Sequence, residues 1–146
     1  MALQVSDTTV IDDSRNGVNL ALFKAASYQE TYTAVTSSSN ATTVTCSAGN
    51  MFSHALTENT TFTFSSPPSS GTAYSFSLKL VQDGSASGYT VTWPAAVDWA
   101  AATAPTLTAT ASAVDMFVFV THDGGTCLLY TSDAADDSLR VDLGGR

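Results

Sequence analysis

The sequence predicts an all-β fold, an antiparallel, jelly-roll-like β-sandwich preceded by a short hairpin and connector. Three observations support this class. Apolar residues recur at every second position, and turn-forming residues separate these runs. Charged residues make up only 12% of the chain, against roughly 25% in an average soluble domain. The 146 residues are enough for one domain with a core of its own.

The first predicted element is a hairpin over residues 3–13 that turns near Ser6 and Asp7. Two strands alone are only marginally stable in water. We therefore expect residues 1–26, the hairpin and its connector, to join the main domain, a neighbouring protomer or a preceding protein.

The main domain is predicted over residues 27–126. Alternation of apolar and polar residues marks strands at Thr61–Phe64, Tyr74–Leu80 and Tyr89–Trp93, each with one face on a core and one in water. The run Met116–Val120 is apolar on both faces, which predicts a central strand buried on both sides. The shared phase of alternation places nine side chains in one core: Phe62, Phe64, Phe76, Leu78, Leu80, Val91, Trp93, Phe117 and Phe119.

Turn chemistry separates these runs. The compositions of Ser65–Gly71 and Asp83–Gly88 indicate loops. Pro94 should end the strand before it, because proline has no N–H to donate to a neighbouring strand. Asp123–Gly125 follows a hydrophobic run and indicates a hairpin.

The end of the chain resembles translated sequencing adaptor. Cys127–Asp136 and Val141–Arg146 match two constant blocks of a common transposon-based adaptor in one reading frame, with a variable stretch between them. We interpret residues 127–146 as a non-native tail that truncates the domain at its last strand; the alternative is a natural acidic tail. Leu128 to Tyr130 should imitate the lost strand by pairing with Phe117–Val120. Residues 133–146 should make few contacts.

Charge and hydropathy exclude two classes of partner. The net charge of −8 argues against nucleic acid, because phosphate binding needs clustered lysine and arginine. No run reaches the roughly 20 apolar residues needed to cross a bilayer, so we expect no membrane insertion. The first residues have no basic and apolar pattern typical of a secretory signal, so synthesis in a cytoplasm is expected.

No catalytic or metal-binding motif is found, and we expect a protein that is not an enzyme and needs no cofactor or metal. His54 is interpreted as a strand residue that faces solvent, and His122 as the start of a turn. Cys46 is interpreted as a small buried apolar residue rather than a functional thiol. The pair Asp12–Asp13 fits a solvated turn better than a cation site.

Aromatic residues offer two interpretations. Tyr89, Trp93 and Trp99 could form a platform for sugar, although aromatics that alternate along a strand more often belong to a core. Trp99 lies beyond Pro94 and is predicted to be the more exposed tryptophan. Trp99 and Tyr89 are therefore the candidate contacts for a glycan or partner.

Several stretches resemble virion proteins. Val5–Asn16 resembles the opening of tail-fibre and related virion proteins of tailed bacteriophages, particularly marine ones. The order of a β-domain common in those proteins is followed by Gly49–Phe52, Asn59–Phe64, Pro67–Tyr74, Leu80–Asp83, Thr90–Pro94, Thr103–Thr106 and Ala113–Asp115 through Asp123–Gly125. Two departures are Asp7, where relatives usually have glycine, and the replaced closing strand.

The resemblance implies a structural component of the phage virion, a tail-fibre or tail-associated protein made in the bacterial host cytoplasm and located in the virion tail. Fibres of this kind are commonly trimers, so it implies a homotrimer that also contacts other virion proteins. Two alternatives stay open. One is a carbohydrate-binding module that recognises host surface glycan, and the other is a capsid decoration protein.

Overall fold

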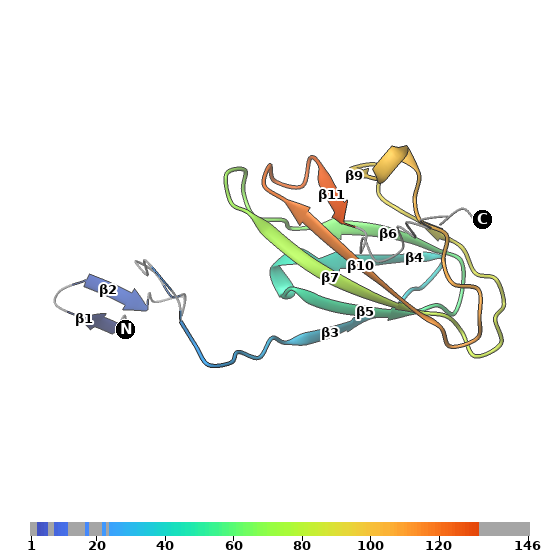
Figure 1. The fold of residues 1–146 in the computed structure, drawn as a ribbon, viewed down its shortest axis with the longest axis horizontal. Coiled ribbons are helices and arrows are strands. Elements are labelled where there is room, and N and C mark those ends of the chain that lie inside the picture. Colours follow the sequence, from blue (N-terminus) through green and yellow to red (C-terminus); the bar gives the residue numbers. More distant parts are fainter. Residues whose placement is uncertain (1–2, 6–7, 12–16, 18–21, 23, 132–146) are drawn as a thin grey trace, which may run out of the picture.

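The computed structural model confirms the all-β class (Figure 1). It describes residues 3–5, 8–11, 17, 22 and 24–131. Within these residues the regular structure is strands, apart from two short 3-10 turns, η1 (Cys46–Ala48) and η2 (Ala100–Ala102). The strands form sheets of two, six and three members.

The predicted N-terminal hairpin is present. Strand β1 (Leu3–Val5) pairs antiparallel with β2 (Thr8–Ile11), with Val5 opposite Thr8. The predicted turn at residues 6–7 lies outside the described residues. The two strands form a sheet of their own, separate from the six-stranded and three-stranded sheets.

The chain then winds back and forth between two sheets. Six strands take part: β3 (Tyr32–Val35), β4 (Ala41–Thr45), β5 (Met51–Ala55), β6 (Thr60–Ser65), β7 (Tyr74–Val81) and β8 (Val91–Thr92). The odd-numbered strands enter the six-stranded sheet, and the even-numbered strands form the three-stranded sheet. Because each turn of this coil runs in the same direction, β3, β5 and β7 are parallel to one another, and so are β4, β6 and β8.

Antiparallel pairing closes the domain. Strand β10 (Val114–Thr121) pairs with β7 along its whole length, and β11 (Leu128–Thr131) pairs with β10. Phe119 lies opposite Tyr130 and Val120 opposite Leu129, so the predicted pairing of Leu128 to Tyr130 with β10 is confirmed for Leu129 and Tyr130. The other side of β11 pairs in parallel with β9 (Val97–Asp98). The prediction for residues 133–146 lies outside the described residues.

The predicted antiparallel pairing is wrong for most of the domain. Of the eight strand pairings in the described part of the chain, three are antiparallel and five are parallel, namely β3–β5, β5–β7, β4–β6, β6–β8 and β9–β11. Side chains alternate between faces with a period of two in both kinds of sheet. Alternation therefore predicts which side chains share a face, but not the direction of the neighbouring strand.

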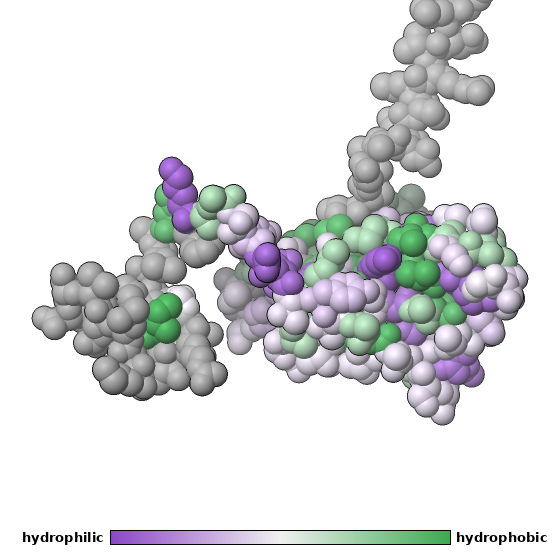
Figure 2. Space-filling model, turned by 90° about the horizontal axis from the view of Figure 1, so that it is seen from below, coloured by the Kyte–Doolittle hydropathy of each residue, from purple (hydrophilic) through white to green (hydrophobic). Residues whose placement is uncertain are grey.

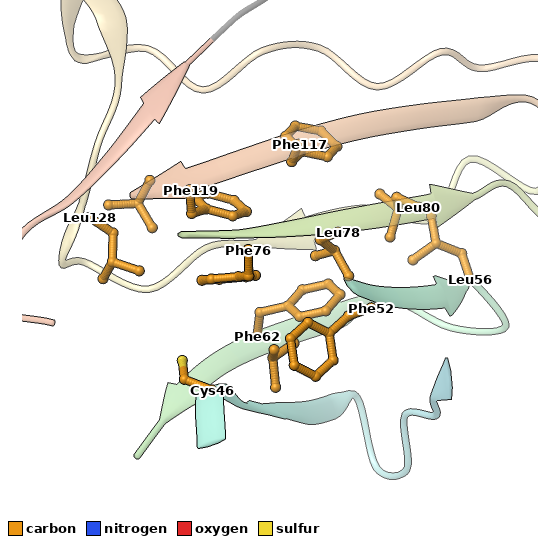
Figure 3. Packing of buried hydrophobic residues seen from close by; sticks show 12 residues of the cluster. Cys46, Phe52, Leu56, Phe62, Phe76, Leu78, Leu80, Phe117, Phe119 and Leu128 are labelled. Carbon is orange, nitrogen blue, oxygen red and sulfur yellow. The ribbon is translucent and has the colours of Figure 1, made fainter. Parts of the chain in front are cut away.

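The core lies between the two sheets, and five of its twelve buried residues are phenylalanines (Figure 3). Among the nine predicted core side chains, Phe62, Phe76, Leu78, Leu80, Phe117 and Phe119 are buried, and Phe64, Val91 and Trp93 are partly buried against them. The ring of Phe76 stacks on that of Phe119 at 5.1 Å, and Phe62 stacks on Trp93 at 5.3 Å. The predicted register is confirmed, because a slip of one residue would turn this set outward.

Two predictions of exposure are wrong. The strand β10 is buried on one face only, since Val114 and Met116 are 49% and 48% exposed. His54, predicted to face solvent, is 1% exposed and meets Phe62 edge-on. It shares the phase of Phe52, whose side chain is buried. Its Nδ1 lies 2.9 Å from the Val35 carbonyl oxygen and its Nε2 3.4 Å from Thr60 Oγ1, so both ring nitrogens have polar neighbours in the core.

Candidate functional site

A pocket of about 310 Å³ opens beside the C-terminal end of β7. Its lining comes from three segments: Gln82 directly after β7, residues 88–91 at β8, and residues 105–107 and 109 in the loop that leads to β10. Ligand pockets usually measure about 300–1,000 Å³. The volume therefore suits a small molecule or a single ring of a larger one.

Gln82 is the buried polar group of this pocket. The side chain continues the inward row of β7 after Leu78 and Leu80 and is 6% exposed. Among the described residues, no hydrogen bond to its amide is found, and the only fully enclosed side-chain atoms without a partner are Ser37 Oγ and Glu58 Oε1. Gln82 lines the pocket, so a molecule bound there can meet its side-chain amide. Without a ligand, water can take the same hydrogen bonds.

Apolar side chains form most of the remaining wall. Tyr89, Val91 and Leu107 are half-buried and pack against the core from the pocket side. Pro105 is half-buried and adds a rigid apolar ring. A planar ring beside aliphatic groups and one buried amide is a common composition for a ligand pocket, where apolar contacts give affinity and a few polar groups fix orientation.

The loop before Tyr89 is held by a carboxylate. Asp83 accepts hydrogen bonds from the Ser87 hydroxyl at 2.7 Å, the Ser87 amide at 2.8 Å and the Ser85 amide at 3.0 Å. The bonds from Ser87 lower the pKa of Asp83 below its usual value, because they stabilise the charged form. At the far end of this loop, the Thr90 amide donates to Asn59 Oδ1 at 2.9 Å.

The opposite wall is held in the same way. Asp115 accepts a hydrogen bond from the Thr108 hydroxyl at 2.7 Å and one from the Thr108 amide at 3.0 Å. The backbone N–H of Gln82 donates to the Ala113 carbonyl at 2.9 Å, which ties the start of β10 to the end of β7. Both walls are therefore fixed before any ligand arrives, and a preformed pocket loses little entropy on binding.

The two aromatic candidates from the sequence are not brought together. Tyr89 lines the pocket, whereas Trp99 packs in an aromatic cluster around Phe117 and Tyr130. Its ring lies 5.4 Å from Trp93 and 4.8 Å from Tyr130. Trp99 is only partly exposed, because β11 brings Tyr130 over it. Of the two residues, Tyr89 is the one that meets a pocket.

The outer face of the six-stranded sheet forms a second candidate site. Outward side chains of β10 and β11, together with Val81 of β7, form an apolar face, defined here as Val81, Val114, Met116, Val118, Val120 and Leu129. Two other outward residues of β7, Ser75 and Ser77, are polar and lie opposite Val120 and Val118. Val114, Met116 and Leu129 are 44–49% exposed. Lys79, opposite Met116, is the charged residue beside them on β7. Seen from below, the molecule shows hydrophobic and hydrophilic residues side by side on its surface (Figure 2).

The outer face of the three-stranded sheet is different. Its outward side chains form a threonine face, defined as Ala41, Thr43, Thr61, Thr63 and Thr92, all exposed. Thr43 lies opposite Thr63, and Thr61 lies between Ala41 and Thr92. Hydroxyl groups can bond to water on this face, so exposure here leaves no polar group without a partner.

Other reactive side chains are dispersed or buried. In residues 24–131, together with the described positions before them, no group of three or more His, Cys, Asp or Glu lies close enough to hold a metal ion. Cys46 is 3% exposed, as predicted, and burial raises the pKa of its thiol. Over the same part of the chain, no helix is long and apolar enough to span a membrane.

Comparisons with known proteins add no relative. No protein-family model matches the chain, and no match was found among curated proteins or among solved structures. Functional inference therefore depends on the residues and their geometry.

Sequence patterns missed most of the pocket. Gln82, Pro105 and Leu107 were not candidates, because they lie in segments that the sequence marks only as loops or strand ends. One signal was present: Gln82 keeps the phase of the inward row of β7, where a polar residue must find a partner or a solvated space. The segment around Leu107 carries no such signal.

Proposed function

We propose that this chain is a structural component of a phage virion, a tail-fibre or tail-associated protein whose two sheets form a β-sandwich used in assembly or host attachment. The observation that carries the proposal is the apolar face, which β10 and β11 form together with Val81. The ordered resemblance over residues 5–125 supports the virion location. The apolar face and the resemblance both favour a protein that functions by binding other proteins.

The apolar face favours assembly for an energetic reason. Fully burying one Val, Leu or Met side chain contributes about 1.5–3 kcal/mol, so covering the exposed half of one contributes on the order of 1 kcal/mol. Val114, Met116 and Leu129 each offer that contribution. Monomeric proteins seldom leave large contiguous apolar patches in water, and such patches usually mark interfaces.

The occupant we propose is another copy of the chain, in a three-fold assembly. A trimer covers the same face on every protomer through a repeated contact, as closed cyclic symmetry requires. Phage tail fibres, which the sequence resembles, are commonly trimers, and this resemblance supports a trimer over a dimer. A capsid decoration protein is the competing assembly, and a stable monomer would favour a carbohydrate-binding module.

Light scattering on the purified chain tests the proposal. We expect a trimer for the parent chain and a monomer for the double variant Val114→Lys/Met116→Lys, because six charges would meet in the interface. The variant Thr63→Lys, on the threonine face, is the matched control and should stay trimeric. The milder variant Val114→Thr/Met116→Thr should weaken the trimer and keep the strand circular dichroism. A parent chain that is monomeric at all concentrations, or a lysine variant that stays trimeric, would reject the proposal.

A further inference from the structure

We propose that the pocket between β7, β8 and the loop before β10 binds one neutral sugar ring. This inference goes beyond the assembly role, because the pocket is lined by Gln82, residues 88–91, residues 105–107 and Ala109, none of which belongs to the apolar face. The pocket therefore functions or fails independently of the oligomeric state.

The charge of the pocket selects a neutral ligand. No ionisable acid or base lines the pocket apart from the tyrosine hydroxyl, among the residues that the structure describes. The nearest carboxylates along the chain, Asp83 and Asp115, already accept hydrogen bonds from Ser85, Ser87 and Thr108 of the flanking loops. A phosphate or an acidic peptide would find no cation here. A ligand amine would have to compete with these loop groups for a carboxylate.

The polar and apolar parts of the lining match the two sides of a pyranose. The Gln82 amide has a carbonyl that accepts and an NH₂ that donates, which suits a pair of neighbouring sugar hydroxyls. Tyr89 and Leu107 offer apolar surface to the C–H groups of the ring. An aromatic ring that stacks on a sugar, with an amide that fixes the hydroxyls, is a combination that needs neither charge nor metal.

Size and rigidity favour a sugar over a peptide. A volume of about 310 Å³ holds one ring, whereas an extended peptide needs a groove several residues long or a free strand edge. Hydrogen bonds to Asp83, Asp115 and Asn59 hold the walls in place without ligand. A preformed pocket of this size binds single sugars weakly, with a Kd of about 1 mM, and gains strength when several copies act together.

Nuclear magnetic resonance on the whole chain tests the inference. Glucose, galactose, mannose and N-acetylglucosamine are titrated separately, and the side-chain NH₂ of Gln82 and the amides of Tyr89 and Leu107 are followed. At least one sugar should shift these signals to saturation. The variant Gln82→Leu should lower the affinity for that sugar by about tenfold or more. It removes both hydrogen-bonding groups of the side chain and places an apolar residue in the inward row.

A second pair of variants separates stacking from general surface effects. Tyr89→Leu removes the ring from the pocket and should weaken binding by about tenfold. Tyr28→Leu is the matched control, since Tyr28 is 73% exposed and does not line the pocket. The inference would be overturned if no sugar caused a saturable shift, or if the shifts appeared at Tyr28 instead. Unchanged sugar binding by the Gln82→Leu variant would overturn it as well. Saturation by an N-acetylated dipeptide amide and by no sugar would reassign the pocket to peptide.

Discussion

The outer faces of the two sheets differ although their inner faces are alike. Both sheets turn large apolar side chains inward, where Phe62 and Phe119 meet the same core. Outward, the three-stranded sheet presents threonines such as Thr43 and Thr63, whereas the six-stranded sheet presents the apolar face with Val114 and Met116 half exposed. A threonine face is suited to water, and an apolar face is suited to a partner.

The two sheets show that the direction in which a side chain points and its exposure to water are separate properties, which a sequence pattern combines. Alternation reports which side chains share a face, and apolarity reports which faces avoid water. On β10 both faces are apolar, yet a single chain covers only the face that carries Phe117 and Phe119. When a sheet packs against the core with one face only, an apolar opposite face therefore indicates a surface that another molecule covers.

The largest expected effect concerns the two faces of β10. Phe119→Ala should lower the free energy of unfolding by about 3–5 kcal/mol, because it empties a site that is 0% exposed among several aromatic rings. Met116→Ala, on the opposite face, should lower it by about 1 kcal/mol or less. Urea denaturation in dilute, monomeric solution measures both. Equal losses would mean that the outer face is as tightly packed as the inner one.

A smaller effect follows from converting one face into the other. Thr43→Val/Thr63→Val places two apolar residues directly opposite each other on the threonine face. Monomer stability should change by only about 0.5 kcal/mol, because valine suits a strand and the sites are exposed. Self-association should increase, and sedimentation velocity measures it. Ser85→Val, in an exposed loop, is the control; the same increase there would show that any added apolar residue causes association.

The smallest expected effect concerns the turn that sets β11, the strand that supplies Leu129 to the apolar face. Asp123 accepts hydrogen bonds from the Cys127 amide at 3.1 Å and the Thr121 hydroxyl at 2.9 Å, and these lower the pKa of its carboxyl. Because the pKa of this carboxyl is lower in the folded state, its charged form stabilises the fold at any pH above the unfolded pKa of about 3.9. This stabilisation is lost as the pH falls through the pKa of the folded state.

Asp123→Asn should therefore be less stable than the parent at neutral pH, and the difference should shrink below about pH 4. Thermal unfolding from pH 7 to pH 2 measures this difference. Asp98→Asn, at an exposed aspartate in β9, provides the control and should follow the parent curve. A difference for Asp123→Asn that does not depend on pH would mean that the charge of the turn does not stabilise β11.

The candidate site was predictable only in part. Tyr89 was a candidate from its place in an alternating aromatic run, and it does line the pocket. Trp99 was the other candidate, and it lies in the aromatic cluster instead, because the pairing of β11 with β10 brings Tyr130 within 4.8 Å of it. Gln82 and Leu107 come from segments 25 positions apart, so no local pattern could relate them.

The sequence by itself determined the strand class, the inward set of side chains, the hairpin at the N-terminus and the pairing of Leu129 and Tyr130 with β10. All four depend on local information, namely a period of two and the chemistry of turns. Only the tertiary structure decided that the strands wind in parallel between two sheets, that His54 is buried, and that Gln82 meets Tyr89 in a pocket. These depend on which segments become neighbours, and contacts between distant segments leave no period in the chain.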